Sequence, residues 1–232
     1  MNEIIRKRKS IRKYSPTPLD DATMQQIQEK INTLTPLYPH IRHSVEFTAK
    51  TKGMFHVKAP HYLIFGSEEK EGSYENIGFL GQQLDLFLSE LGIGTCWLGA
   101  AKPEEKQASA LPYVVAMSFG TPDEPIHRTH ATFKRKPLDQ ISEGSDSRLE
   151  AARLAPSGMN AQNWHFIAED GKIHCYRKKP KAPLGFILNK LGSIDIGIAI
   201  CHIAAETENF HFIADENAPE RKGYIYTGTV GK

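Results

Sequence analysis

The sequence predicts an α+β fold with an internal repeat. Segments with apolar residues at helical spacing and segments with alternating or continuous apolar residues are both present, and they do not follow one another in strict alternation. Two similar tripeptides, Asn76-Ile77-Gly78 and Asp195-Ile196-Gly197, each open an apolar helical segment. They lie 119 residues apart (197 minus 78), so the repeat divides the chain near its middle.

Composition limits the class of protein. The chain has 232 residues, 40% of them hydrophobic, and a net charge of +2, which gives no bulk attraction for nucleic acid. No stretch approaches the roughly 18 uninterrupted apolar residues of a membrane helix. Cys96, Cys175 and Cys201 form no C-x-x-C pair, and the ten histidines show no metal-ligand spacing, so we expect a cytoplasmic protein without a metal site.

Four elements are predicted in the first 92 residues. Asp20 is a suitable N-cap for an amphipathic helix with one apolar face, formed by Met24, Ile27, Ile31 and Leu34. Residues 45–49 alternate as in a half-buried strand, and residues 62–65 form a continuous apolar strand. Apolar residues then return at helical spacing from Glu75 to Gly92, which predicts a core helix.

The middle of the chain is rich in glycine and polar residues. A Gly-rich elbow at 92–99 precedes a polar, helix-like stretch from Pro103 and a buried strand at 113–119. Residues 120–137 form a polar loop long enough for a functional role, with six basic side chains: His127, Arg128, His130, Lys134, Arg135 and Lys136. Residues 142–147 read as a polar linker.

The remaining elements follow this linker. A short helix at 148–154 leads into a turn-rich loop at 155–160. Residues 164–168 and 173–176 predict a hairpin around Asp170-Gly171, and a helix is expected from Ile194 to Glu206.

Three segments could carry chemistry. Alternation along an extended chain places Arg8, Ser10 and Arg12 on one side, where their donors could converge on an anion, although a solvated basic arm is the alternative. The loop at 155–166 could read a heteroaromatic edge, or could be an ordinary helix-to-strand turn. The elbow would admit a flat ligand, but it lacks the third glycine and the preceding strand of a dinucleotide fingerprint.

A thiol mechanism is also conceivable from the sequence. Cys96 could act as a nucleophile with His165 as its base, but the sequence offers no third group to orient them. Cys96 lies beside Trp97 in an apolar context, which favours a buried and inert thiol.

Together the three segments resemble the FMN-dependent nitroreductase family. The matching motifs are Arg-Lys-Ser-Ile-Arg-Lys-Tyr from Arg8, Gly-Ile-Gly-Thr-Cys-Trp-Leu-Gly from Gly92, and Ala-Pro-Ser-Gly-Met-Asn-Ala-Gln-Asn-Trp-His-Phe from Ala155. The resemblance implies a nitroreductase-like fold and an enzyme that moves electrons from NADH or NADPH through FMN. Its acceptor would be a small electron-poor molecule such as a nitroaromatic or a quinone, reduced in a ping-pong cycle.

The resemblance also implies a set of site residues. Arg8, Lys9 and Ser10 would contact the phosphate, ribityl chain and pyrimidine carbonyl of FMN, and Arg135 would complete the phosphate site. Arg12 would lie at the N1/O2 edge as the catalytic cation, and the backbone near Leu98 and Gly99 would lie near N5. The loop that closes over the flavin would supply Pro156, Ser157, Gly158 and Asn160, with Gln162 as support.

The order of the motifs departs from the family pattern. The Pro-Ser-Gly-Met-Asn loop should follow the basic segment within a few dozen residues, but here it follows the elbow and the long loop. We therefore expect a tandem form, a monomeric pseudo-dimer whose halves, 1–141 and 142–232, form one intertwined unit. Asn163 also stands where the family usually has proline.

Two alternatives remain open at this stage. The flavin fold could support a different reaction, such as dehalogenation or flavin fragmentation. The chain could instead bind nucleic acid or a protein partner through its basic N-terminal segment, with no catalysis.

Overall fold

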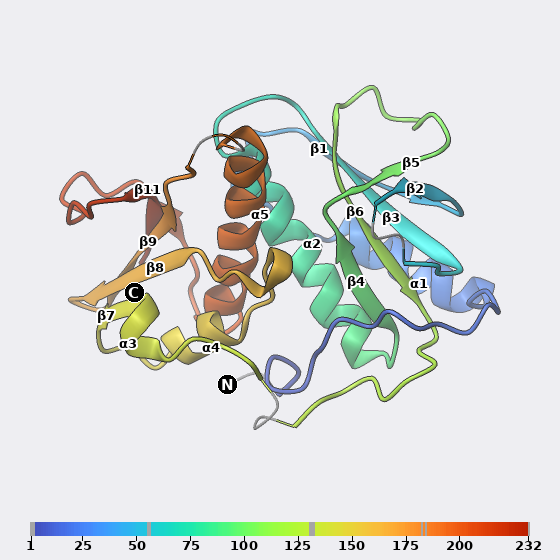
Figure 1. Ribbon diagram of the computed structural model, residues 1–232, viewed down its shortest axis with the longest axis horizontal. Coiled ribbons are helices and arrows are strands. Elements are labelled where there is room, and N and C mark those ends of the chain that lie inside the picture. Colours follow the sequence, from blue (N-terminus) through green and yellow to red (C-terminus); the bar gives the residue numbers. More distant parts are fainter. Residues whose placement is uncertain (1–2, 55–56, 130–132, 182, 184, 232) are drawn as a thin grey trace.

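Two helices cross at the centre of the molecule between two β-sheets (Figure 1). The computed structural model describes residues 3–54, 57–129, 133–181, 183 and 185–231. The central helices are α2 (Ser73–Glu90) and α5 (Gly185–Ala204), which pack on each other. Helix α2 contacts the first sheet and α5 contacts the second, so the core has a sheet–helix–helix–sheet arrangement.

The first sheet has four antiparallel strands in the order β1-β3-β6-β4. The strands are β1 (His43–Thr48), β3 (His61–Ser67), β6 (Tyr113–Gly120) and β4 (Gly94–Leu98). Helix α1 (Asp21–Asn32) precedes them and is capped as predicted, because the Asp20 carboxylate accepts the Thr23 N–H at 2.7 Å. A separate ribbon pairs β2 (Thr51–Gly53) with β5 (Ala101–Pro103).

The second sheet repeats this arrangement. Its strands β8 (Trp164–Glu169), β9 (Lys172–Lys178), β11 (Tyr224–Val230) and β10 (Phe212–Ile213) neighbour one another in that order. Each half therefore contains, in chain order, a helix, two sheet strands, a core helix and two more sheet strands. In both sheets the last strand in the chain lies between the second and third, as β6 lies between β3 and β4, and β11 between β9 and β10. Helix α4 (Leu149–Leu154) takes the place of α1, and β7 (Ser142–Gly144) adds to β8 in parallel after the short α3 (Leu138–Ile141).

Reciprocal glycine contacts let α2 and α5 approach each other closely. A Cβ on Gly78 would collide with the Ile194 carbonyl oxygen, and a Cβ on Gly197 would collide with the Glu75 carbonyl oxygen. The two repeat tripeptides predicted from the sequence therefore meet at the crossing, as expected for helices whose smallest residues lie at the contact. Helix α5 is also long and apolar enough to span a bilayer, but most of that segment is buried in the core.

Several predicted elements are correct, and others need correction. Helix α2, strands β1, β3 and β6, helix α4 and the β8–β9 hairpin lie where the sequence placed them. Helix α5 begins at Gly185, well before Ile194, and the stretch after Pro103 forms no helix in its described residues. Residues 130–132 of the predicted long loop, His130 included, lie outside the described residues.

Several segments that differ from the prediction form strands with residues far away in the sequence. Most of the predicted elbow is strand β4, whose Gly94 leaves room for Ile11 of the basic segment. The polar linker contributes β7 because β8 offers it a free edge, and residues 224–230 form β11 against β9. These strands depend on pairing with residues far away in the sequence, which local patterns do not report.

The helix crossing generates a stability prediction. Gly197→Ala places a methyl group against the α2 backbone, so we expect a loss of about 1–3 kcal/mol or more in the free energy of unfolding. Gly192→Ala is the matched control, because Gly192 lies on the same helix with open space beside it and should gain up to about 1 kcal/mol. Chemical denaturation of both variants measures the difference, and equal stabilities would contradict the close crossing.

Candidate functional site

The basic N-terminal segment lies against β4. The Ile11 N–H donates to the Thr95 carbonyl at 2.8 Å, Ser10 pairs with Thr95 in a parallel bridge, and the Ile11 side chain is fully buried. Since the chain is extended here, alternate residues point the same way, and Arg8, Ser10 and Arg12 line one cavity. The structure thus brings these three side chains to one cavity, and the segment is held against the sheet by backbone hydrogen bonds.

The loop after α4 approaches this segment from the second half of the chain. Its turn η2 (Gly158–Asn160) holds Met159 and Asn160 at positive φ, and Gln162 follows with φ 48°. The Gly158 N–H donates to the Asp195 carboxylate at 2.9 Å, and the Gln162 N–H donates to Ser157 Oγ at 3.0 Å. These hydrogen bonds offset the cost of the positive φ angles. Such uncommon backbone conformations are typical of functional loops.

Arg135 secures the same loop. Its Nε donates to the Ala155 carbonyl at 3.0 Å, its Nη2 to the Leu154 carbonyl at 3.3 Å, and its Nη1 to Asn160 Oδ1 at 2.5 Å. Burial and the nearby Arg8, Arg128 and Arg153 lower the pKa of Arg135 to about 9. The guanidinium thus holds the loop in shape, in addition to the phosphate role that the resemblance implies.

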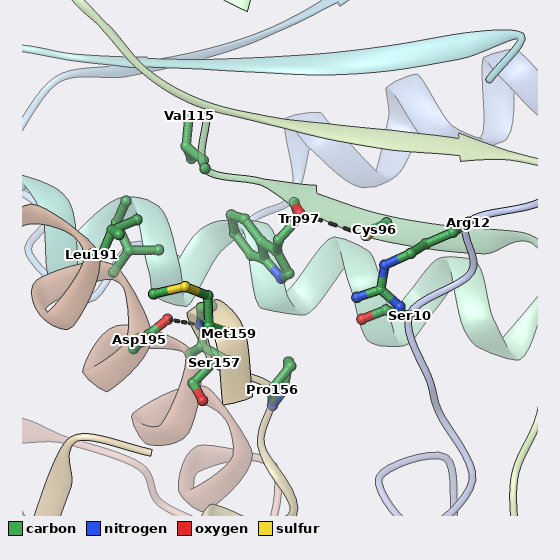
Figure 2. A pocket seen from close by; sticks show the side chains of 14 residues that line it. Ser10, Arg12, Cys96, Trp97, Val115, Pro156, Ser157, Met159, Leu191 and Asp195 are labelled. Carbon is green, nitrogen blue, oxygen red and sulfur yellow. Dashed lines mark hydrogen bonds between the residues drawn. The ribbon is translucent and has the colours of Figure 1, made fainter. Parts of the chain in front are cut away.

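The central cavity lies between the basic segment, β4, this loop and α5 (Figure 2). Its volume is about 110 Å³. Its lining combines polar and apolar residues: Ser10, Arg12, Cys96, Trp97, Gly99, Val115, Pro156, Ser157, Gly158, Met159, Leu191, Ile194, Asp195 and Ile198. Gly81 lets Trp97 pack against α2, and Trp97 Nε1 donates to Gln82 Oε1 at 3.3 Å. This composition suits a flat, partly polar ring system.

The basic cavity adjoins the central cavity and shares Ser10, Arg12, Pro156, Ser157 and Met159 with it. Five cationic side chains line this cavity, whose volume is about 390 Å³: Arg8, Arg12, Arg128, Lys134 and Arg135. Burial and the neighbouring Arg8 and Arg12 lower the pKa of Arg128 to about 10. So many cations facing one space favour an anion as its occupant.

Arg8 is the most buried of these cations, with 1% of its side chain exposed. Its Nε lies 2.8 Å from Asp85 Oδ2, and its Nη2 donates to Ser10 Oγ at 3.3 Å. Its buried Nη1 has no hydrogen-bond partner among the described residues. A buried donor without a partner beside an anion-favouring cavity points to a ligand oxygen at that position.

The structure brings most of the predicted site residues together. Arg8, Ser10, Arg12, Gly99, Arg135, Pro156, Ser157, Gly158 and Asn160 line one or both cavities. Lys9 instead pairs with Glu124 at 3.2 Å, Leu98 is buried in β4, and Gln162 accepts the Lys136 N–H at 2.7 Å behind the loop. Among the residues that line the cavities, Arg128, Lys134, Trp97 and Asp195 were not predicted as site residues. A signal for three of them was present in the sequence, because Arg128 and Lys134 lie in the long basic loop and Asp195 opens the second repeat tripeptide.

The thiol alternative gains nothing from the geometry. Burial raises the pKa of Cys96, whose Sγ lies 3.5 Å from the Trp97 carbonyl oxygen. His165 lies in β8 with its ring against Tyr224 and does not line the central cavity. Among the described residues, no three His, Cys, Asp or Glu side chains gather where they could hold a metal ion.

Comparison with known protein families identifies the class of protein that has this fold. Residues 1–207 match the family described as "Putative TM nitroreductase", so the chain belongs to the nitroreductase family. None of the curated proteins is detectably similar in sequence.

Solved structures share the fold. A "putative nitroreductase" from Thermotoga maritima superposes with a TM-score of 0.66 at 20% identity, covering 98% of this chain and 91% of the other. A nitroreductase family protein from Clostridium difficile has a TM-score of 0.50 at 15% identity, and 96% of it aligns with only 60% of this chain. The rest of this chain therefore has no counterpart in that alignment.

The Arg135 contacts predict a local change in dynamics. In Arg135→Ala the loop loses the hydrogen bonds that Arg135 donates to Ala155, Leu154 and Asn160. Its backbone amides should therefore exchange faster with solvent, at least about tenfold for bonds worth about 1.5 kcal/mol together. Arg128→Ala, which removes a cation from the same cavity, is the control. Hydrogen exchange read by mass spectrometry over residues 155–162 makes the comparison, and indistinguishable rates in the two variants would count against the role of Arg135.

Proposed function

We propose that the protein is an FMN-dependent oxidoreductase that takes electrons from NADH or NADPH and reduces a small electron-poor acceptor. The observation that carries this proposal is the continuity of the two cavities, one shaped for a flat ring and the other rich in cations. FMN has the same two parts, a planar ring and a phosphate. Family membership and the three sequence motifs support the same cofactor.

The residues present fit FMN. The unpartnered Nη1 of Arg8 offers a donor to a phosphate oxygen, with Arg128, Lys134 and Arg135 around the same space. Ser10 and Ser157 lie where the two cavities join and can bind the polar chain between ring and phosphate. Trp97, Gly99 and Ile198 line the cavity for the ring.

Bound FMN would supply the redox chemistry, accepting a hydride from the nicotinamide and passing two electrons to the acceptor. The chain's own residues orient the cofactor and adjust its charge. Arg12 lines both cavities and is exposed, so its guanidinium can reach the N1/O2 edge and stabilise negative charge there. Met159, 88% exposed, stands at the rim of the central cavity, where an acceptor would enter.

Shared strand order and reciprocal glycine contacts support a single-chain pseudo-dimer, with residues 1–141 and 142–232 as its two halves. The mirror position of the cofactor site has a different composition. Pro36-Leu37-Tyr38 takes the place of Pro156-Ser157-Gly158, and the Tyr38 N–H donates to Asn76 Oδ1 at 3.0 Å as Gly158 does to Asp195. The Tyr38 ring packs on Gly72 at the start of α2, where the mirrored ring site would be.

The nucleic-acid alternative has less support. The basic segment is anchored against β4, with Ile11 buried, Arg8 paired with Asp85 and Lys9 paired with Glu124. These side chains are not presented to the sugar-phosphate backbone of a large polyanion. The remaining expectations, a cytoplasmic location and a small-molecule partner, follow from the proposed reaction.

An absorbance titration tests the function. The purified protein should be yellow or take up added FMN, and stepwise anaerobic addition of NADH or NADPH should bleach the flavin bands. Oxidised acceptors such as a quinone should then restore them. A protein that stays colourless with excess FMN would refute the proposal.

Two arginine variants should have separable effects. Arg8→Ala should weaken FMN binding far more than riboflavin binding, because riboflavin has no phosphate. Arg12→Ala should still bind FMN but lower its midpoint potential by some tens of millivolts, since a charge-assisted hydrogen bond is worth about 1.5–3 kcal/mol and about 1.4 kcal/mol corresponds to 30 mV. Fluorescence titration and potentiometry measure the two effects, and interchanged or equal effects would show that these roles are misassigned.

The pseudo-dimer predicts one FMN per chain in a monomer. The mirror position has Tyr38 in place of Gly158, and residues 142–148 contain no Arg-x-Ser-x-Arg, so we expect only one complete site. Acid release of the flavin, quantified against protein, and mass measurement in solution give the ratio and the state. A ratio near two, or a homodimer whose FMN touches both chains, would contradict this architecture.

A further inference from the structure

Asp195 is a carboxyl group in the wall of the central cavity. It lies on α5, with 6% of the residue exposed, and Figure 2 shows its side chain beside Ser157 and Met159. Its Oδ1 accepts the Gly158 N–H at 2.9 Å. Among the described residues that line this cavity, Asp195 is the only carboxylic acid.

The hydrogen bond to the loop does not require an acid. At the mirror position Asn76 on α2 accepts the Tyr38 N–H at 3.0 Å, and Asn76 is as deeply buried as Asp195. An amide oxygen therefore performs the structural task in the first half, where the cavity beside Tyr38 and Gly72 is not lined by Asn76. The carboxyl group occurs at the mirror position that does line a cavity, which implies a task beyond holding the loop.

No cation neutralises Asp195. The other titratable groups lining the cavity are Arg12 from the basic segment and Cys96 from β4, and neither forms an ion pair or hydrogen bond with it among the described residues. On α2, Glu75 pairs with Arg177 and Asp85 pairs with Arg8. On α5 itself Lys190 lies over the rings of Tyr74 and Tyr113, and His202 bonds to Ala151 and Gln82.

Burial without a cation disfavours the carboxylate. It raises the pKa of Asp195 to about 7, and only the Gly158 N–H acts against it. A carboxyl group that holds its proton near neutral pH and gives it up easily has the proton affinity suited to acid catalysis.

We propose that Asp195 is a catalytic acid that protonates the acceptor as it is reduced in the central cavity. This inference rests on the proposed function, because the acceptor must bind beside the flavin ring, at the part of the central cavity that Asp195 lines. It adds a residue role that hydride chemistry on a flavin does not by itself require.

The step balances for a quinone acceptor. Reduction to the hydroquinone needs two electrons and two protons, and the hydride equivalent that originates from NADH or NADPH brings both electrons and one proton. The Asp195 O–H bond breaks as a new O–H bond forms on the quinone oxygen, which supplies the second proton. The resulting Asp195 carboxylate recovers a proton from water through the open side of the cavity.

Two substitutions separate catalysis from structure. Asp195→Asn keeps an oxygen for the Gly158 N–H, as Asn76 does in the mirror half, but has no proton to give, whereas Asp195→Ala loses both. The measured quantity is the rate of flavin re-oxidation by a quinone divided by the rate with ferricyanide, which accepts electrons without protons. We expect this ratio to fall at least about tenfold at pH 7 in both variants, and the wild-type ratio to decline as pH rises through about 7.

A second readout needs neither cofactor nor turnover. Because the folded-state pKa of Asp195 lies above its unfolded value, the folded protein binds the extra proton and wild-type stability should fall as pH rises from about 4 through about 7. Asp195→Asn lacks this contribution, so its unfolding midpoint relative to wild type should rise over that range. All other titrating groups are common to both proteins and cancel in the difference.

The outcomes are distinct. A lower ratio in both variants together with the pH-dependent stability difference supports the acid role. A ratio that falls only in Asp195→Ala, or a stability difference that does not change with pH, overturns it. A protein that never binds FMN overturns the proposed function, whereas a yellow protein with an unchanged ratio in Asp195→Asn overturns only the role of Asp195.

Discussion

The close crossing of α2 and α5 is the contact on which the rest of the structure depends. Two glycines remove the side chains that would hold the helix backbones apart, so Gly78 meets the Ile194 carbonyl and Gly197 meets the Glu75 carbonyl. Each helix can then bury one side on its partner and another on its own sheet. The crossing also sets α5 opposite β4, and the central cavity forms in the space that remains.

The two halves share the same loop-to-helix hydrogen bond, but the space beside that bond is used differently in each half. In each half the residue before the repeat isoleucine accepts a backbone N–H from the loop that leads into β1 or β8, respectively. In the first half the donor is Tyr38, whose large ring packs on Gly72, and its hydroxyl donates to the Thr227 carbonyl at 3.3 Å. In the second half the donor is Gly158, which has no side chain, and the corresponding space belongs to the central cavity.

Local patterns identified the elements whose signals are carried by neighbouring residues. The Asp20 cap, the apolar periodicity of α2 and the Asp170-Gly171 turn all act within a few residues, and each was predictable. Strands β7 and β11 were missed because their partners lie elsewhere in the chain. For the site, the motifs located Arg8, Arg12 and the 155–162 loop. Asp195 and Arg128 line the cavities because of tertiary packing, which local motifs do not report.

A buried polar network links the helix crossing to the basic cavity. Gln82 on α2 donates to Asp85 at 2.7 Å, accepts from Trp97 Nε1 and contacts His202 Nε2 of α5 at 3.1 Å. Burial lowers the pKa of His202 to about 3, so its ring is neutral at physiological pH. Its Nδ1 lies 2.9 Å from the Ala151 carbonyl and must donate, which leaves Nε2 to accept from Gln82.

The network explains how a fully buried Arg8 is tolerated. Asp85 neutralises the guanidinium, and the Thr95 hydroxyl and Gln82 amide donate to the Asp85 carboxylate, so the ion pair is desolvated but otherwise well bonded. Among the described residues, Nη1 of Arg8 has neither a hydrogen bond nor an ion-pair contact to Asp85, and Arg8 lines the basic cavity. Side chains from both halves therefore hold Arg8 at the wall of the cavity, where an anion could accept from Nη1.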